Sequence, residues 1–244
     1  NLVMYVLFAL VAITQFNLEI HAKVKHQDAV DLKSKENRKR FTAMMLVCTM
    51  FAICWIAYIQ WETTIASFTQ SINISMSQYS VLWTINGIMI LVAQPLIRPI
   101  IVILRGNLKH QMFVGILIFM SSILVTSFAH HFAIFVVGMV ILTFGVMFVW
   151  PAVPTIANKL APEGKQGQYQ GFVNSASTVG KAFGPFIGGI LVDAMNMSMM
   201  FVGMIVLLCF GLIFLSIFDR GLPKDKNETP IPRRRKRRKS KASK

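Results

Sequence analysis

The feature that most constrains this chain is a series of apolar runs long enough to cross a lipid bilayer. A transmembrane helix needs about 20 predominantly apolar residues. Runs of that kind lie at roughly 42–68, 78–104, 111–129, 132–157, 168–193 and 198–218, with a shorter one at 1–15. The chain is 55% hydrophobic and only 14% charged, which argues against an ordinary soluble domain. The sequence therefore predicts an all-α polytopic membrane protein.

The order of these runs predicts four parts. Residues 1–15 open directly in apolar sequence, which is typical of the cut end of a transmembrane helix. We therefore expect the sequence to be a piece of a longer protein, without its N-terminal portion. A polar, charged linker follows at 16–41, a compact six-helix transmembrane bundle at 42–218, and a basic tail at 219–244.

The distribution of lysine and arginine predicts the orientation of these helices. The linker carries seven such residues, and the loops after it carry none, three, none, two and none in turn. The tail from Arg220 onward carries twelve. Cytoplasmic loops of membrane proteins are enriched in these residues. We therefore expect a cytoplasmic linker and tail, six complete crossings between them, and a location in the cell membrane.

Glycines recur at fixed intervals in the stretch GFVNSASTVGKAFGPFIGG. They lie at Gly171, Gly180, Gly184, Gly188 and Gly189, with Pro185 among them. Such a run is costly in a soluble helix. Transmembrane helices instead pack by close backbone approach at small residues. The spacing predicts that Gly180, Gly184 and Gly188 form a groove on one side of the helix for a neighbouring helix.

The same six positions resemble the antiporter motif of the major facilitator superfamily, in its drug:proton antiporter branch. That motif is usual on the fifth helix of the family, and this copy falls on the penultimate helix of the chain. The resemblance therefore implies the C-terminal six-helix half of a twelve-helix bacterial multidrug transporter, plus the end of its sixth helix. It also implies proton-driven export of small lipophilic drugs, bound between this half and an absent N-terminal half.

Polar residues at membrane depth are usually functional, and the clearest one here is Lys181. Asn174, Thr178 and Lys181 are spaced i, i+4 and i+7, so they share one helix face. We interpret this face as a candidate lining of a substrate cavity. The alternative is that Lys181 extends toward the interface or pairs with a carboxylate for structural reasons.

Four more polar residues are candidates for the same cavity. Gln60 and Glu62 lie toward the outer end of their helix, where the carboxylate is a candidate for binding a cation or a proton. The alternative is an interfacial glutamate already near water. Asn86 and Gln94 lie two turns apart near mid-depth of the next helix. They suit hydrogen bonding to a substrate, or hydrogen bonding between helices.

Trp150, Pro151 and Pro154 lie in the inner third of their helix. Two prolines three residues apart are expected to bend it. A large aromatic side chain beside a bend suits a cytoplasmic gate, although ordinary packing explains it equally well.

The sequence offers no support for an enzyme. It contains no spaced cluster of metal ligands, no phosphate-binding loop and no pair of nucleophile and base, so we expect no cofactor and no metal. The basic run RRRKRRKSK in the tail suits contact with anionic membrane lipids, and we expect no nucleic acid. Two other functions stay open: transport of a specific metabolite such as a sugar or peptide, and a non-transporting scaffold whose tail recruits partners.

Overall fold

Helices account for nearly all of the chain that the computed structural model describes, which is residues 35–103, 107–220 and 222. Their bounds are α3 (Lys35–Ile59), α4 (Thr64–Ser71), α5 (Met76–Ile103), α6 (Leu108–Ser127), α7 (Phe132–Val149), α8 (Ala152–Leu160), α9 (Gln166–Ala194) and α10 (Met197–Ile217). No strand occurs within those ranges. The all-α prediction is therefore confirmed. The predicted span 1–15, most of the linker and nearly all of the tail lie outside the described residues.

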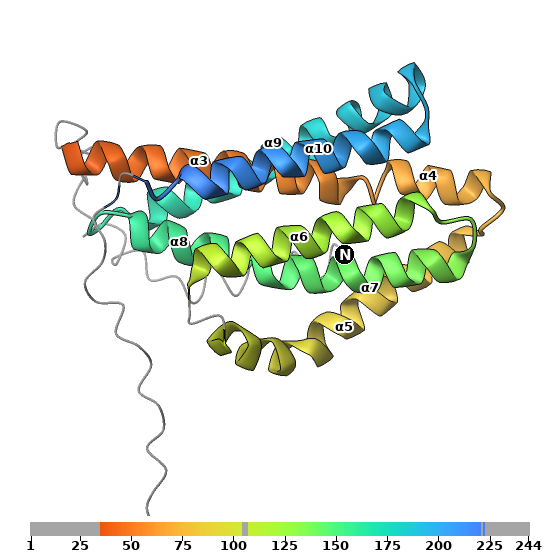
Figure 1. Ribbon diagram of the computed structural model, residues 1–244, viewed down its shortest axis with the longest axis horizontal. Helices are drawn as coiled ribbons and strands as arrows, with labels where there is room; N and C mark the ends of the chain where they lie inside the picture. The colour runs from red at the N-terminus through yellow and green to blue at the C-terminus, as the bar shows by residue number, and fades with distance from the viewer. Residues whose placement is uncertain (1–34, 104–106, 221, 223–244) are drawn as a thin grey trace, which may run out of the picture.

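The helices run back and forth along one direction (Figure 1). Asparagine side chains begin two of them: Asn107 accepts from the backbone N–H of Lys109 at 3.0 Å, and Asn196 accepts from that of Met199 at 2.9 Å. Capping of this kind satisfies backbone donors that the first helical turn leaves free. Short connections between α6 and α7, and between α9 and α10, make those pairs antiparallel.

Two of the predicted spans are broken helices. The span predicted at 42–68 divides into α3 and α4 around residues 60–63, and the span at 132–157 divides into α7 and α8 at Trp150 and Pro151. In addition, α3 begins by Lys35, so the last residues of the predicted linker are helical. An ion pair between Arg40 and Glu36, one turn apart at 2.7 Å, supports this charged first part of the helix.

Among the residues that the structure describes, five segments are long and apolar enough to cross a membrane: Glu36–Ser71, Met76–Ala93, Leu108–Ser127, Phe132–Leu160 and Met197–Ile217. The sixth predicted span, α9, has 29 residues and so extends for about 43 Å. Its glycines and polar residues make it less apolar than the other five. Five of the six predicted crossings thus have the length and hydropathy of a membrane span, and the sixth stays a prediction.

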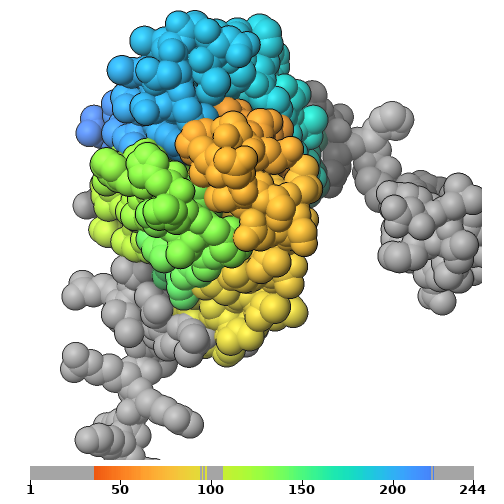
Figure 2. Space-filling model, turned by 90° about the vertical axis from the view of Figure 1, so that its right-hand side faces the viewer, coloured from red at the N-terminus to blue at the C-terminus, as the bar shows by residue number. Residues whose placement is uncertain are grey.

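The core of the bundle lies between α3, α6, α7, α9 and α10. Viewed from the end that carries α4, α9 and α10 lie on one side of the molecule and α5 on the opposite side (Figure 2). Large apolar side chains stay exposed on the outer faces, for example Leu91 at 77%, Phe186 at 66% and Ile213 at 54%. Exposed apolar surface of this extent is typical of faces that meet lipid or another protein segment.

The closest helix contact outside the α6–α7 pair joins α3 to α9. At Gly180, a Cβ would lie 2.5 Å from the carbonyl oxygen of Ala52. At Gly184 it would collide with Ile59, and at Gly188 with the Gln60 side chain. All three glycines therefore lie against α3, and only a residue without a side chain allows so close an approach.

Candidate functional site

Aromatic side chains from three parts of the fold meet beside the break between α7 and α8. We call the group of Phe51, Trp55, Tyr58, Trp83 and Trp150 the aromatic cluster. The Trp150 ring lies at its centre, with centroid distances of 5.4 Å to Phe51, 5.0 Å to Trp55 and 5.5 Å to Tyr58. Trp83 from α5 joins through Tyr58 at 6.2 Å. The cluster links α3, α5 and the α7–α8 break, and all of its members except Phe51 are half-buried.

The break itself explains how Trp150 reaches this position. Pro151 has no backbone N–H and cannot continue the hydrogen bonding of α7. The chain therefore turns at Trp150 and Pro151 before α8 begins at Ala152. Pro154 lies inside α8, and its carbonyl oxygen accepts from Gln170 of α9 at 2.8 Å. At the predicted bend the helix assignment breaks for two residues, although Trp150 and Pro151 keep helical backbone angles. The gate role of Trp150, Pro151 and Pro154 stays a prediction.

Lys181 lies next to the aromatic cluster. Its Nζ is 4.1 Å from the centre of the Trp55 ring, within the range of a cation–π interaction. Lys181 is the sixteenth of the 29 residues of α9, so it lies near the middle of the span. The side chain is exposed, and no ion pair joins it to any acid within the described residues.

The energetic position of Lys181 is unfavourable without a further partner. A lysine at the centre of a transmembrane helix costs about 2.5–3.5 kcal/mol on the scale derived from membrane insertion. A cation–π contact returns about 0.5–2 kcal/mol. The Trp55 ring therefore offsets only part of the cost, and water or an anion must supply the rest.

The predicted polar face of α9 is open. Asn174 and Thr178 are both exposed, as Lys181 is, and the Thr178 hydroxyl donates to the Asn174 carbonyl at 3.0 Å. The glycines at positions 180, 184 and 188 lie on an adjacent, buried side of the helix. One helix thus presents a polar face beside the aromatic cluster and a glycine face to its neighbour. The cavity role of the polar face stays a prediction.

Two other predicted cavity residues lie in helix contacts. Gln60 is 1% exposed; its Nε2 donates to the carbonyl oxygens of Gly184 at 2.8 Å and Ile56 at 2.9 Å. The Thr64 hydroxyl donates to the Gln60 Oε1 at 2.7 Å. The amide of Gln60 is thus used in joining α3 to α9, instead of pointing into an open space.

Asn86 is 6% exposed and donates through Nδ2 to the hydroxyl of Thr143 at 2.8 Å, which joins α5 to α7. Of the two interpretations of Asn86, this geometry favours hydrogen bonding between helices. The second amide predicted on that helix, Gln94, falls within α5 where the side chains lie outside the described residues.

Glu62 lies in the break between α3 and α4 and is exposed. Its backbone N–H donates to Ile59 at 2.9 Å, and no basic side chain pairs with its carboxylate within the described residues. Trp61, next to it, is fully buried, so it packs in the core and does not anchor the helix at the membrane surface. Glu62 is therefore an accessible carboxylate at the break between α3 and α4.

The remaining positions of the glycine motif have no close neighbours. A Cβ at Gly171 or Gly189 would meet nothing within 4 Å. Pro185 is half-buried inside a continuous α9. The five glycines of the motif thus divide into three that pack closely against a neighbouring segment, at positions 180, 184 and 188, and two that do not. Within this half of the fold, packing accounts for the first three only.

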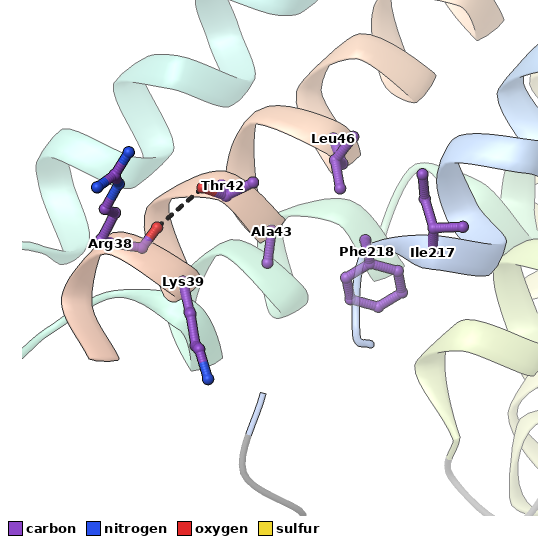
Figure 3. Close-up of a pocket in the computed structure, with 7 residues that line it drawn as sticks. All are labelled: Arg38, Lys39, Thr42, Ala43, Leu46, Ile217 and Phe218. Carbon is purple, nitrogen blue, oxygen red and sulfur yellow. Dashed lines mark hydrogen bonds between the residues drawn. The ribbon is translucent and has the colours of Figure 1, made fainter. Parts of the chain in front are cut away.

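A separate cavity of about 340 Å³ lies at the end where α3 begins and α10 ends (Figure 3). Its apolar lining includes Ala43, Leu46, Ile217 and Phe218. Arg38 and Lys39 stand at its edge, and the Thr42 hydroxyl donates to the Arg38 carbonyl at 3.0 Å. This cavity lies away from the aromatic cluster and has the composition of an interface between water and lipid.

Sequence reasoning did not single out Phe51, Trp55 or Tyr58. Their spacing of i, i+4 and i+7 is the signal that could have identified them, because it places the three rings on one face of α3. That spacing is also usual for plain core packing. The positions of Trp150 and Lys181 beside those rings are what distinguish a candidate binding face from ordinary core packing.

The fold is half of a facilitator-type transporter bundle, and comparison with known proteins agrees. The sequence pattern of the Major Facilitator Superfamily matches residues 41–243. The chain belongs to the Major Facilitator Superfamily, a family of membrane transporters and not of enzymes.

Two relatives share parts of the sequence. The chain is 42% identical over 222 residues to the uncharacterized MFS-type transporter YttB of Bacillus subtilis (strain 168), which covers 91% of this chain and 56% of that protein. It is 34% identical over 86 residues to an uncharacterized MFS-type transporter of Methanocaldococcus jannaschii, which covers 34% of this chain and 22% of that protein. The chain therefore spans about half the length of the first relative. The drug:proton antiporter branch stays a prediction.

Proposed function

We propose that this chain is the C-terminal half of a secondary active transporter that exports lipophilic drugs in exchange for protons. The observation that carries the proposal is the open face on which the aromatic cluster and Lys181 meet. Helices α3, α5, α9 and the α7–α8 break all contribute to it. Binding sites for small molecules combine mostly apolar and aromatic surface with a few polar groups, and this face has that composition.

In this proposal the six spans move as one body against the other half of the protein, with the substrate bound between the two near mid-membrane. Transporters built from repeats bind their substrates at such an interface. The contacts of the Trp150 ring with Phe51, Trp55 and Tyr58 support the gate role proposed for it, in which a small displacement of the ring changes access to the face. The alternating basic and neutral loops support a cytoplasmic position for the linker and tail.

We also propose that membrane lipids are partners at the basic end of the bundle. The cavity edged by Arg38 and Lys39 has an apolar lining, and the tail adds a run of basic residues. Basic groups near a membrane surface are attracted to anionic headgroups. Lipophilic substrates and protons are the other partners, together with the N-terminal half of the same protein.

The test uses the full-length protein in cells that lack their main efflux pumps. We expect lower accumulation of lipophilic dyes in cells that express it, and a return to control levels when an uncoupler collapses the proton gradient. Accumulation that expression does not change for any dye would contradict the proposal. Loss of the effect on deleting residues after Arg220, with the protein still in the membrane, would favour the scaffold interpretation instead.

A further inference from the structure

The electrostatics of the open face single out one chemical class of substrate. Lys181 is exposed near the middle of α9, with its ammonium over the Trp55 ring. A cationic side chain at this depth of a membrane is costly, and the aromatic ring offsets only part of that cost. Water or an anionic partner can offset the rest.

None of the acids in the described part of the chain supplies that partner. Glu36 pairs with Arg40, and Asp219 pairs with Lys109. The other three described acids, which form no ion pair within the described residues, are Glu62, Glu163 and Asp193. Glu62 lies in the α3–α4 break and Glu163 in the turn before α9, while Asp193 is twelve residues along α9 from Lys181.

The surroundings of Lys181 suit a ligand with two different parts. On one side lie Trp55 and, 5.0 Å from it, Trp150, which offer flat apolar faces to an aromatic body. On α9 itself lie the exposed Asn174 and Thr178, which offer hydrogen bonds to oxygen atoms. A carboxylate from another part of the protein would interact with the Lys181 ammonium alone and leave the aromatic rings without a partner. An aromatic anion uses the ammonium, the rings and the polar face together.

We propose that Lys181 makes this transporter selective for lipophilic organic anions, with a carboxylate or sulfonate on the ammonium and an aromatic body against Trp55 and Trp150. This inference rests on the proposed transport function and narrows its substrate class. A cationic compound of the same size meets repulsion from Lys181, and a neutral one gains only the aromatic contacts. Charge, more than size, then decides which compounds bind.

The experiment compares two ligands of matched shape, naphthalene-2-sulfonate and N-methylquinolinium, which carry opposite charges on a bicyclic aromatic frame. Binding is measured by calorimetry on the purified full-length protein in lipid nanodiscs. We expect the sulfonate to bind at least tenfold more tightly than the quinolinium. Lys181→Gln should lower the affinity for the sulfonate at least tenfold without lowering that for the quinolinium, and Lys181→Glu should reverse the preference.

Two variants control for other causes. Lys181→Arg keeps the charge and should keep the preference for the anion. Lys159→Gln removes an exposed lysine of α8 far from the aromatic cluster and should bind both ligands as the wild type does. Thermal unfolding of each variant without ligand shows whether it folds, and where Lys181→Gln does not fold, Lys181→Met, which also removes the positive charge, is measured in its place.

An equal affinity of the wild type for both ligands would overturn the inference, as would a Lys181→Gln variant that loses both ligands equally. The second result would show that Lys181 pairs with a carboxylate of the protein. Either result leaves uncoupler-sensitive export of dyes intact, so it is distinguishable from failure of the proposed function, in which no dye is exported at all.

Discussion

Replacing Gly188 with alanine tests whether close backbone packing holds α9 against α3. The added Cβ would fall on the Oε1 of Gln60 and lie 2.8 Å from the hydroxyl oxygen of Thr64. The amide must then move, and the hydrogen bond from its Nε2 to the carbonyl of Gly184 is lost. Gly189 is the matched control, because a Cβ there meets nothing within 4 Å.

The magnitude follows from three contributions. Overpacking in a filled interior costs about 1–3 kcal/mol, and a hydrogen bond between transmembrane helices contributes about 0.6–1.7 kcal/mol. Alanine returns about 1 kcal/mol through its better helix propensity. We therefore expect Gly188→Ala to lower the free energy of unfolding by about 1–4 kcal/mol. Gly189→Ala has only the last contribution, so it should be neutral or stabilising by up to about 1 kcal/mol.

The assay is thermal unfolding of the full-length protein in detergent, followed by size-exclusion chromatography with fluorescence detection. A third variant, Gln60→Ala, removes the side chain that the new methyl group meets. In that background Gly188→Ala should cost less, because interacting residues give non-additive effects. The reasoning is refuted if Gly188→Ala is as stable as Gly189→Ala, or if its cost is unchanged when Gln60 is absent.

Three further perturbations follow from the described contacts. Trp150→Ala removes three aromatic pairs, each worth about 0.5–1.5 kcal/mol. It should therefore lower the free energy of unfolding by about 2–4 kcal/mol and reduce dye export in cells. A Trp150→Ala protein that is as stable and as active as the Trp150→Phe protein would contradict this. Asn86→Ala and Thr143→Val should show a coupling energy of about 0.6–1.7 kcal/mol in a double-mutant cycle of unfolding, and additive effects would show that the bond is unimportant. Lys109→Met breaks a partly exposed ion pair with Asp219 and should change the free energy of unfolding by less than about 1 kcal/mol. A melting temperature lowered by many degrees would show that this ion pair contributes more than expected.

The sequence was sufficient to predict the helices and the glycine groove, because each depends on local pattern. Apolar length defines a span, and residues four apart define a face. The sequence does not predict which helix packs against the glycine groove. Nothing in the spacing of Gly180, Gly184 and Gly188 says that α3 lies against them, since the partner is set by the packing of all six spans.

The two helix breaks illustrate the same limit. Pro151 and Pro154 made the second break predictable, because proline removes a backbone donor. The first break contains neither proline nor glycine. There the side chains of Gln60 and Thr63 donate to the carbonyl oxygens of Ile56 and Ile59, in competition with the backbone of the helix. The sequence predicts Gln60 as a cavity residue, whereas its side-chain amide joins α3 to α9 in the structure.

The aromatic cluster could not be predicted because its members come from distant parts of the chain. Trp55 and Trp150 are 95 positions apart, and each alone is an ordinary apolar residue of a transmembrane helix. Lys181 was identified because charge is rare at that depth. Its aromatic neighbour was not, since a cation–π contact leaves no trace in sequence spacing.

The contact between α9 and α3 has a mechanical consequence. Most packed helices are separated by side chains, which absorb a small tilt by changing rotamer. At Gly180 no side chain intervenes, and Ala52 and Trp55 meet the backbone of α9 directly. If a ligand binds at Lys181 as proposed, we expect a tilt of α9 to shift α3 as well, and Trp55 to pass that shift to the ring of Trp150. The proposed binding position and the proposed gate would then be coupled through the backbones of two helices.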